Sequence, residues 1–217
     1  SGTSQGSDLP ISFNVDIDNL ETLGRNFTNI NLTGGEQPDA WHVSVSGPQA
    51  QGTMIIPREY PERSLTLDFE RLWLERFDPE NRSVRIDPRT IPSFVLNAKS
   101  LRFGEIDLGT VELTTRRVEN GVKLDRLQAS EARFTLQGDG DWLLHGDVHQ
   151  CRINLTVYDK TLSGLLQRFD YEVANIDGGK TKIGIEAIWD GMPSEFTLDK
   201  LYGSFELHVD KGRFLDI

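Results

Sequence analysis

Two short segments contain residue types whose spacing could support chemistry, and the first fits the pattern of a phosphate-binding loop. Residues 174–181 read A-N-I-D-G-G-K-T, a degenerate form of that pattern. Such a loop must follow a buried strand and open a helix, because the amide groups of the helix N-terminus hold the phosphates. Here Lys180 leads into an alternating, strand-like run from Thr181 to Glu186. The segment therefore predicts a hairpin turn at Asp177 to Gly179 and no nucleotide site.

The second segment places two histidines, an aspartate and the single cysteine at alternate positions: His145, Asp147, His149 and Cys151. On a helix, histidines four residues apart can share a zinc ion. In a strand the same spacing separates them by about 13 Å, too far for one ion, although neighbours two residues apart could share one. No further cluster of ligand residues follows in the sequence. We therefore expect no metal site, but an exposed strand end with a partly buried thiol.

No catalytic motif is evident elsewhere in the sequence. Neither the G-x-S-x-G pattern of a hydrolase nucleophile nor the H-E-x-x-H pattern of a zinc protease occurs. Carboxylates are plentiful, but solvation explains their scattered positions, so no acid/base pair can be named. Trp41, Trp73, Trp142 and Trp189 could form a ligand platform, although packing in the core or at a sheet rim is the simpler expectation for each. We predict no enzyme activity, no catalytic residue and no cofactor.

Composition and charge narrow the class of protein. The chain has 217 residues, of which 37% are hydrophobic, so it can build a core. It has 23 Lys and Arg against 34 Asp and Glu, a net charge of −11 that should repel nucleic acid and anionic membrane surfaces. A single cysteine excludes an internal disulfide, and no run approaches the ~18 apolar residues of a membrane helix. Residues 1–8 are polar and rich in Gly and Ser, as in a linker or a cloning scar.

Hydrophobic and polar residues alternate nearly everywhere, which is the period of a β-strand. Successive side chains of a strand point to opposite faces, so each strand should have one apolar and one polar face. Glycine-containing turn signals separate the runs. We predict a mainly β fold of about a dozen or more strands. They should form an antiparallel-rich sheet with one face exposed to solvent. Clear examples are residues 13–17, 65–69, 153–157 and 205–209, and 69–77 is also interpreted as a strand rather than a helix.

One segment departs from this period. A short amphipathic helix is predicted from Thr161 to Phe169, and either Asp159 or Thr161 can cap its start. Two turns of helix cannot persist alone, so the helix must pack on something apolar. Its apolar stripe consists of Leu162, Leu165, Leu166 and Phe169.

The sequence contains a weak internal repeat with an offset of 81 residues. Leu20 corresponds to Leu101, residues 27–32 correspond to 108–113, and a fainter echo pairs residues 92–94 with 193–196. Repeats of short amphipathic strands favour an extended, stacked sheet. Residues 9–217 are predicted to form one elongated β region with weak repeats at 9–57, 92–143 and 144–217.

The C-terminal half of the sequence carries short motifs in a definite order. They are G-D-G-D-W at 138–142, the strand at 153–157, the short helix, D-G-G-K at 177–180, W-D-G-M-P at 189–193, F-x-L-x-x-L-x-G-x-F at 196–205 and D-x-G-R-F-L at 210–215. In this order the set resembles the C-terminal part of the YhdP-type AsmA-like proteins of Gram-negative bacteria. Residues 94–217 carry the resemblance through their motifs, whereas the earlier residues resemble the family only in the general character of their sequence.

The resemblance implies a fold, a location and a role. Members of this family are anchored in the inner membrane by an N-terminal helix, with most of the chain in the periplasm. Their strands form a long sheet bent into a U-shaped trough with an apolar lining. They are implicated in phospholipid movement toward the outer membrane and in outer-envelope integrity, without known catalytic residues. By this resemblance the chain is a periplasmic segment whose membrane anchor is missing, with phospholipids or fatty acyl chains as its partners.

Apolar positions of one strand parity, together with the helix stripe, are the candidate lining of the trough. At ~0.8 kcal/mol per buried CH₂, such a surface would hold an acyl chain strongly. We expect the helix to lie against this surface and to block or line one end, or else to cover a sheet edge. The candidate residues are Ile153, Leu155, Val157, Leu162, Leu165, Leu166, Phe169, Ile183, Ile185, Phe205 and Leu207.

Two other classes of function compete with lipid transfer. One is a structural or interaction scaffold for the outer envelope, whose open sheet edges pair with strands of a partner protein. The other is an enzyme such as a glycan-acting β-protein, because a fold alone does not define a function. Lipid that copurifies with the chain would favour transfer over a scaffold, and hydrolysis of a glycan would favour the enzyme.

Overall fold

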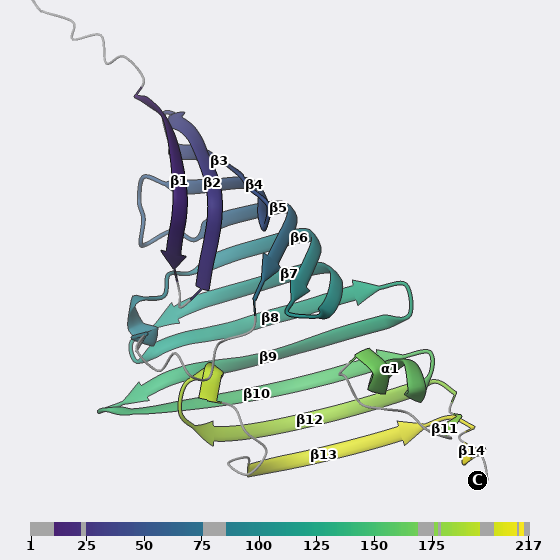
Figure 1. Ribbon diagram of the computed structural model, residues 1–217. Helices are drawn as coiled ribbons and strands as arrows, with labels where there is room; N and C mark the ends of the chain where they lie inside the picture. Colours follow the sequence, from purple (N-terminus) through teal and green to yellow (C-terminus); the bar gives the residue numbers. More distant parts are fainter. Residues whose placement is uncertain are drawn as a thin grey trace, which may run out of the picture.

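The computed structural model describes residues 11–22, 25–75, 86–168, 176–177, 179–195, 202–211 and 213–214. Most of these residues belong to one open sheet of twelve strands, which runs from top to bottom in Figure 1. A two-stranded sheet, one α-helix and two short 3-10 helices complete the described elements. The mainly β, antiparallel-rich fold with one short helix is therefore confirmed.

The large sheet is built almost entirely from strands that lie beside their neighbours in the sequence. In spatial order its strands are β1 (Ser12–Thr22), β2 (Arg25–Glu36), β3 (Ala40–Ser46), β4 (Ala50–Pro57), β5 (Leu65–Leu74), β6 (Phe94–Phe103), β7 (Ile106–Val118), β8 (Gly121–Glu131), β9 (Phe134–His145), β10 (Val148–Asp159), β12 (Thr181–Asp190) and β13 (Tyr202–Val209). The small sheet pairs β11 (Ile176–Asp177) with β14 (Arg213–Phe214). The helices are η1 (Pro88–Thr90), α1 (Leu162–Arg168) and η2 (Pro193–Glu195).

One pair of neighbours departs from the antiparallel pattern. Strands β5 and β6 run parallel, with Leu65 beside Phe94. A parallel pair needs a connection that returns along the length of the strand. The described part of this connection includes η1, where the Asp87 carboxylate accepts a hydrogen bond from the Arg89 amide at 2.9 Å. Helix η1 contacts β8 and β9, so the connection lies against the lower half of the sheet.

The register of the strands places apolar residues in continuous rows across the sheet. Each row takes one residue from every strand, from β1 at one edge to β13 at the other. The first apolar row is Val15, Leu32, Val45, Gly52, Phe69, Ala98, Val111, Ala129, Leu136, Val157, Ile183 and Leu207. The second apolar row is Phe13, Gly34, Val43, Met54, Leu67, Leu96, Leu113, Leu127, Gly138, Leu155, Ile185 and Phe205. Neither row contains a polar side chain.

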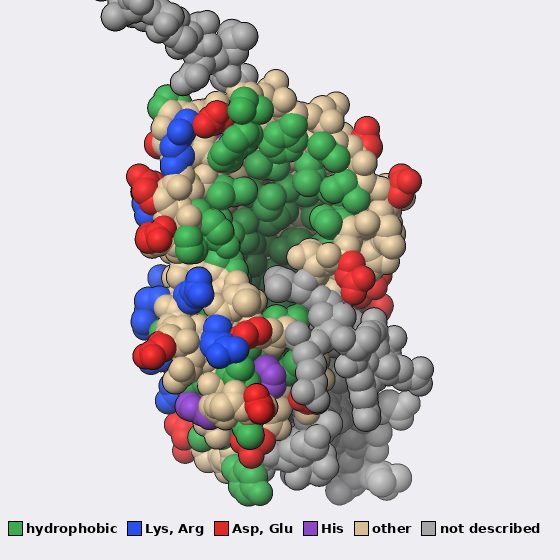
Figure 2. Space-filling view, turned by 90° about the vertical axis from the view of Figure 1, so that its left-hand side faces the viewer, with side chains coloured by type: hydrophobic (Ala, Val, Ile, Leu, Met, Phe, Trp, Pro, Cys, Tyr) green, Lys and Arg blue, Asp and Glu red, His purple; other side chains and the backbone are tan. Residues whose placement is uncertain are grey.

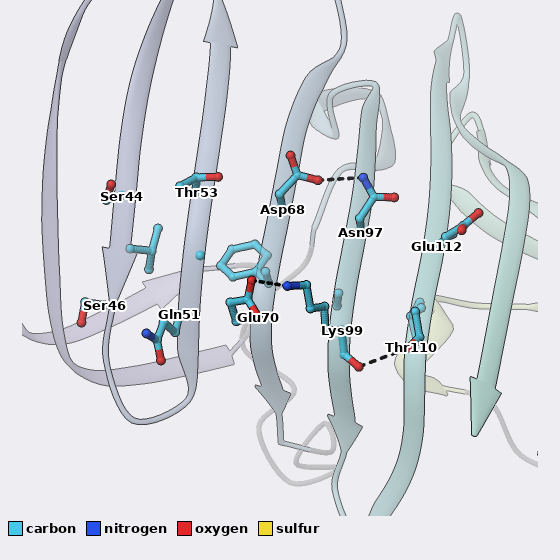
Figure 3. A pocket seen from close by; sticks show the side chains of 15 residues that line it. Ser44, Ser46, Gln51, Thr53, Asp68, Glu70, Asn97, Lys99, Thr110 and Glu112 are labelled. Carbon is cyan, nitrogen blue, oxygen red and sulfur yellow. Dashed lines mark hydrogen bonds and ion pairs between the residues drawn. The ribbon is translucent and has the colours of Figure 1, made fainter. Parts of the chain in front are cut away.

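A polar row runs between the two apolar rows and faces the opposite side of the sheet. Figure 3 shows part of it, with Ser44, Thr53, Asp68, Asn97 and Glu112 on one face of adjacent strands. This is the pleat expected for strands in which polar and apolar residues alternate. The complete row is Asn14, Thr33, Ser44, Thr53, Asp68, Asn97, Glu112, Gln128, Gln137, Thr156, Gly184 and Glu206.

Gly52 is the one member of the first apolar row without a side chain. A Cβ atom there would lie 2.3 Å from the carbonyl oxygen of Asp68 and 2.8 Å from Cδ1 of Phe69. The ring of Phe69 therefore covers the gap that Gly52 leaves, and Phe69 itself is buried. An aromatic side chain that covers a cross-strand glycine keeps the apolar row continuous.

Bulges bend the strands while they keep apolar residues on one face. In the β4–β5 pair, Gly52 lies opposite Phe69 but Gln51 lies opposite Arg71, so β5 carries an extra residue. As a result Phe69 and Leu72 are both buried on the same side, although they are three residues apart. Further register shifts occur between β6 and β7, β7 and β8, and β8 and β9. Bulges increase local twist and bending, which promotes a curved sheet.

Three sequence-based interpretations can be compared with these elements directly. Of the segment 69–77, residues 69–74 lie in strand β5, as the alternation of Leu72 and Leu74 indicated, whereas residues 76 and 77 lie outside the described residues. The hairpin expected at Asp177 to Gly179 is wrong, because Asp177 pairs with Arg213 of β14 rather than with β12. The expected lack of a helix after Lys180 holds, since β12 begins at Thr181.

The two segments of the internal repeat lie in strands of similar arrangement, although their registers differ by one residue. Residues 27–32 lie in β2 and residues 108–113 in β7, each the second strand of an antiparallel pair. Leu20 lies opposite Phe27, and Leu101 lies opposite Gly109. All of these strands belong to one continuous sheet. The division into repeat units at 9–57, 92–143 and 144–217 stays a prediction.

Candidate functional site

The apolar face of the sheet is hollowed. Figure 2 shows hydrophobic side chains gathered in a depression over the upper half of the molecule, where β1 to β6 lie in Figure 1, with charged side chains around its rim. We call this surface, formed by the two apolar rows and the cluster packed on them, the apolar trough. Its buried members are Ile30, Val45, Ala50, Phe69, Leu72, Leu96, Ala98, Leu101, Val111, Ala129, Phe134, Val157 and Leu165.

Hydrogen bonds from the start of β2 hold the upper half of the sheet in its curled form. The Thr28 amide donates to Oε1 of Gln49 at 2.9 Å, and Nε2 of Gln49 donates to the Asn26 carbonyl at 3.3 Å. The Arg25 guanidinium donates to the carbonyl oxygen of Glu75. These bonds join β2 to the β3–β4 turn and to the residue that follows β5, although β2 pairs in the sheet only with β1 and β3.

Seven of the candidate lining residues lie on strands at the lower edge of the sheet. The register places Leu155, Ile185 and Phe205 side by side, and likewise Val157, Ile183 and Leu207, with Ile153 opposite Ala187. All seven therefore face the same side as the buried cluster, which confirms the expected common face. Exposure increases toward the edge: 4% for Val157, 50% for Leu207 and 64% for Phe205. Their role in holding lipid stays a prediction.

The short helix packs on the apolar trough through Leu165. Leu165 is 1% exposed and belongs to the buried cluster, whereas Leu162 is partly buried. The helix is capped by Thr161, whose Oγ1 accepts from the Gly164 amide at 3.1 Å, and Asp159 in turn accepts from the Thr161 amide at 3.0 Å. The side chain of Leu166 and all of Phe169 lie outside the described residues. That the helix blocks or lines one end of the trough stays a prediction.

The segment that contains the two histidines and the cysteine forms the β9–β10 hairpin. Cys151 is 2% exposed, and its thiol donates to the Gly191 carbonyl at 3.3 Å. Burial raises the pKa of this thiol to about 12, so the thiolate that metal binding or nucleophilic attack requires does not form near neutral pH. Nδ1 of His149 accepts a hydrogen bond from the Trp142 indole at 3.1 Å. Among the described residues, no three His, Cys, Asp or Glu side chains are grouped to hold a metal ion.

The four tryptophans do not form one platform, although Trp142 and Trp189 lie opposite Cys151 from the two strands beside it. Trp41 packs beside Phe13, with ring centroids 6.2 Å apart. Trp73 lies at the end of β5 and is 40% exposed. Trp142 is hydrogen-bonded within the β9–β10 hairpin, and Trp189 is buried, with its indole donating to the Met192 carbonyl at 3.1 Å.

The outer, polar face has a shallow depression of about 580 Å³ over β3 to β7, shown in Figure 3. Its side chains largely satisfy one another: Asn97 donates to Asp68 at 2.7 Å, and Lys99 forms an ion pair with Glu70 at 2.7 Å. Such mutual pairing on an exposed face is typical of solvated sheet surfaces. The apolar trough, rather than this depression, is therefore the candidate functional site.

Sequence reasoning located only part of the trough. All the residues predicted to line the trough lie at or after Ile153, whereas most of the buried cluster lies on β2 to β8. The residues it missed include Ile30, Phe69, Leu96 and Val111, all buried. The signal that could have found them was present, because residues 65–69 alternate as clearly as residues 153–157.

The architecture defines a class, an open amphipathic β-sheet protein with a trough-shaped apolar face. A comparison with family models identifies the family within that class. The model described as YhdP protein matches residues 1–217, the whole chain, so the chain belongs to the YhdP family. This membership agrees with the AsmA-like class of envelope protein that the motif order resembles. No curated protein and no solved structure matches the chain significantly.

Candidate membrane spans are a separate matter. Within the part of the chain that the structure describes, no helix is both long enough and apolar enough to cross a membrane.

Proposed function

We propose that this YhdP-family chain binds the acyl chains of phospholipids in the apolar trough, as a periplasmic segment of a protein that moves lipid between the inner and outer membranes. The observation that carries the proposal is the pair of apolar rows that cross all twelve strands without a polar side chain. A soluble protein normally buries such a face against a second layer. Over the upper half of this sheet the face is hollowed and lies open in Figure 2.

The dimensions of the trough suit lipid tails. Twelve strands spaced ~4.8 Å apart make each row about 50 Å long, which exceeds the ~30 Å hydrocarbon core of a bilayer. An acyl chain lying along a row would meet apolar atoms over its whole length. At ~0.8 kcal/mol per buried CH₂, this contact favours retention of the tail. In this proposal the protein has no catalytic step: its side chains exclude water and hold the tail, and the lipid leaves unchanged.

A pair of adjacent residues provides a sharp test. Met54 belongs to the second apolar row and is partly buried, whereas Thr53 belongs to the polar row and is exposed. Met54→Glu should lower the affinity for a fluorescent fatty acid at least 10-fold, because it places a charge in the trough. Thr53→Glu adds the same charge on the opposite face and should leave the affinity unchanged. Met54→Leu should bind like the unmodified chain.

The controls separate loss of binding from loss of folding. Circular dichroism and thermal unfolding of each variant establish which proteins are folded at the assay temperature. Native mass spectrometry with lipid extraction reports whether the purified chain carries phospholipid. A folded Met54→Glu variant that binds the fatty acid normally, in a chain that carries no lipid, would contradict the proposal.

A scaffold role remains the second proposal, because strand β13 is exposed along its length. Tyr202 is 78% exposed and Phe205 64%. One side of β13 has no strand partner among the described residues, so a strand of a partner protein could pair there. Substitution of Tyr202, which lies on the outer face of β13, by Lys should then abolish capture of a partner protein while leaving fatty acid binding in the trough intact.

A further inference from the structure

A pocket of about 440 Å³ lies where β5 and β6 end, at the rim of the apolar trough. Trp73 and Leu74 are consecutive residues that face opposite sides of β5, since Leu74 packs on the buried cluster and Trp73 is exposed on the outer face. The lining of the pocket therefore includes one residue that packs on the trough cluster and one that is exposed on the outer face. Its lining includes Gln49, Trp73, Leu74, Glu75, Arg102 and Glu105.

The pocket carries one cation that is held in place without a carboxylate partner. The guanidinium carbon of Arg102 lies 5.3 Å from the ring centroid of Trp73, which is directly opposite in the register. No described Asp or Glu forms an ion pair with Arg102, although Asp107 lies opposite it in the register of β6 and β7. By contrast, Arg116 and Arg126, which are also exposed, pair with Asp125 and Glu112 respectively. Stacking on an indole leaves the guanidinium N–H groups available for an anion.

The pocket also carries an anion that lacks a partner. Glu105 lies in the β6–β7 turn, three residues after Arg102, is exposed, and forms no ion pair with any described residue. Glu75, the other carboxylate of the lining, is close enough to Arg25 to interact with its charge. The lining thus presents Arg102 and Glu105, a cation and an anion without an ion-pair partner among the described residues, in one open depression of the surface.

We infer that this pocket binds the zwitterionic headgroup of a phospholipid that carries a phosphate and a primary amine, with the phosphate on Arg102 and the ammonium on Glu105. The inference rests on the proposed function, because the acyl tails of that lipid lie in the trough beside Leu74. A phosphate without an amine would meet two carboxylates, Glu75 and Glu105, whose charge repels it. A primary ammonium donates hydrogen bonds to a carboxylate, which a quaternary amine cannot do.

Compounds without acyl chains test the headgroup pocket apart from the trough. In isothermal titration calorimetry, the chain should bind glycerophosphoethanolamine at least 10-fold more tightly than glycerol 3-phosphate or ethanolamine alone. Arg102→Gln should weaken that binding at least 10-fold. Glu105→Gln should remove the preference for glycerophosphoethanolamine over glycerol 3-phosphate. Arg126→Gln and Glu112→Gln, which remove an exposed ion pair on the same outer face, should change neither. Equal affinity for the two phosphates, or unaltered binding by both pocket variants, overturns the inference.

A short-chain lipid distinguishes a lipid headgroup from a free phosphate–amine compound as the ligand. Dihexanoyl phosphatidylethanolamine, used as a monomer, should bind at least 10-fold more tightly than glycerophosphoethanolamine, because its tails reach the trough. Met54→Glu should remove this gain and leave glycerophosphoethanolamine binding intact, whereas Arg102→Gln should leave fatty acid binding intact. Equal binding of the tailed and tailless compounds overturns the assignment to a lipid. Failure of fatty acid binding alone overturns the proposed function instead.

Discussion

The guanidinium of Arg25 lies 5.0 Å from the ring centroid of Phe103, although three strands separate β2 from β6 in the sheet. Arg25 also donates to the Glu75 carbonyl, so one side chain contacts the ends of both β5 and β6. Burial lowers the pKa of Arg25, and the nearby Glu75 charge opposes that effect. The contact shows that the sheet curls until its second strand reaches its sixth at this end, which gives the apolar face its hollow form.

Arg25→Ala should loosen this curl. A cation–π contact contributes about 0.5–2 kcal/mol, and a hydrogen bond to a charged donor about 1.5–3 kcal/mol. Allowing for partial solvent screening, we expect a loss of about 1–2 kcal/mol in the free energy of unfolding by urea. Hydrogen exchange should increase in β1 and β2 more than in β9 and β10.

Arg126→Ala is the matched control for Arg25→Ala. Arg126 pairs with Glu112 at 3.1 Å on the exposed outer face, where ion pairs contribute about 0–1 kcal/mol. Its exchange pattern should match that of the unmodified chain. Equal losses of stability in the two variants would mean that Arg25 acts as an ordinary surface arginine and does not hold the curl.

Leu165→Ala tests whether helix α1 is packed on the trough. Leu165 is 1% exposed within the buried cluster, and truncation of such a leucine destabilises proteins by about 2–5 kcal/mol. Gln167→Ala, on the same helix but exposed, should change stability by less than about 0.5 kcal/mol. Denaturant unfolding of the two variants measures the difference.

The functional role of the helix requires a separate measurement. Leu165→Asp should reduce the stability of the chain further than Leu165→Ala, because it buries a charge. If the helix lines or blocks one end of the trough, Leu165→Ala should also alter the rate of fluorescent fatty acid uptake at a temperature where the variant is folded. An unchanged rate would show that the helix is only a packed corner of the sheet.

The period of the sequence was sufficient to predict the sheet and the identity of its apolar face. The alternation of apolar residues such as Ile153 and Leu155 with polar residues is a local property of each strand, and it is kept in the sheet. The parallel pairing of β5 with β6 could not be predicted in this way, because both orientations give the same alternation. The pairing of Asp177 with Arg213 was missed because it joins residues 36 positions apart, and the local alternation of residues does not indicate such distant pairs.

The curl of the sheet and the pocket at its rim could not be predicted from the sequence. Arg25 and Phe103 meet because of accumulated twist and bulges over several strands, and no motif marks either residue. Trp73 and Arg102 become neighbours only through the parallel register of β5 and β6. The sequence therefore predicted the kind of surface, whereas the positions of its ends and of its charged side chains required the structure.

Cys151 should be almost unreactive in the folded chain. Its thiol is buried, bonded to the Gly191 carbonyl, and has a pKa raised to about 12 by burial and, to a lesser degree, by Asp141 and Glu195. Because the thiolate is the reactive species, labelling by a disulfide reagent at pH 8 should be at least 100-fold slower than in urea-unfolded protein. Labelling of the folded chain at the unfolded rate would contradict the burial.

The same pKa shift predicts how stability changes at alkaline pH. In the unfolded chain the thiol ionises near its ordinary value of 9.0, whereas in the folded chain it stays protonated up to about 12. Between these values the unfolded state releases a proton that the folded state retains, so the unmodified chain should lose up to about 1.4 kcal/mol per pH unit relative to Cys151→Ala. Below pH 9 the difference in stability between the two proteins should be constant. Urea unfolding of both proteins from pH 7.5 to 10.5 measures this difference, and a flat profile across pH 9 would show that Cys151 ionises as readily in the folded chain as in the unfolded one.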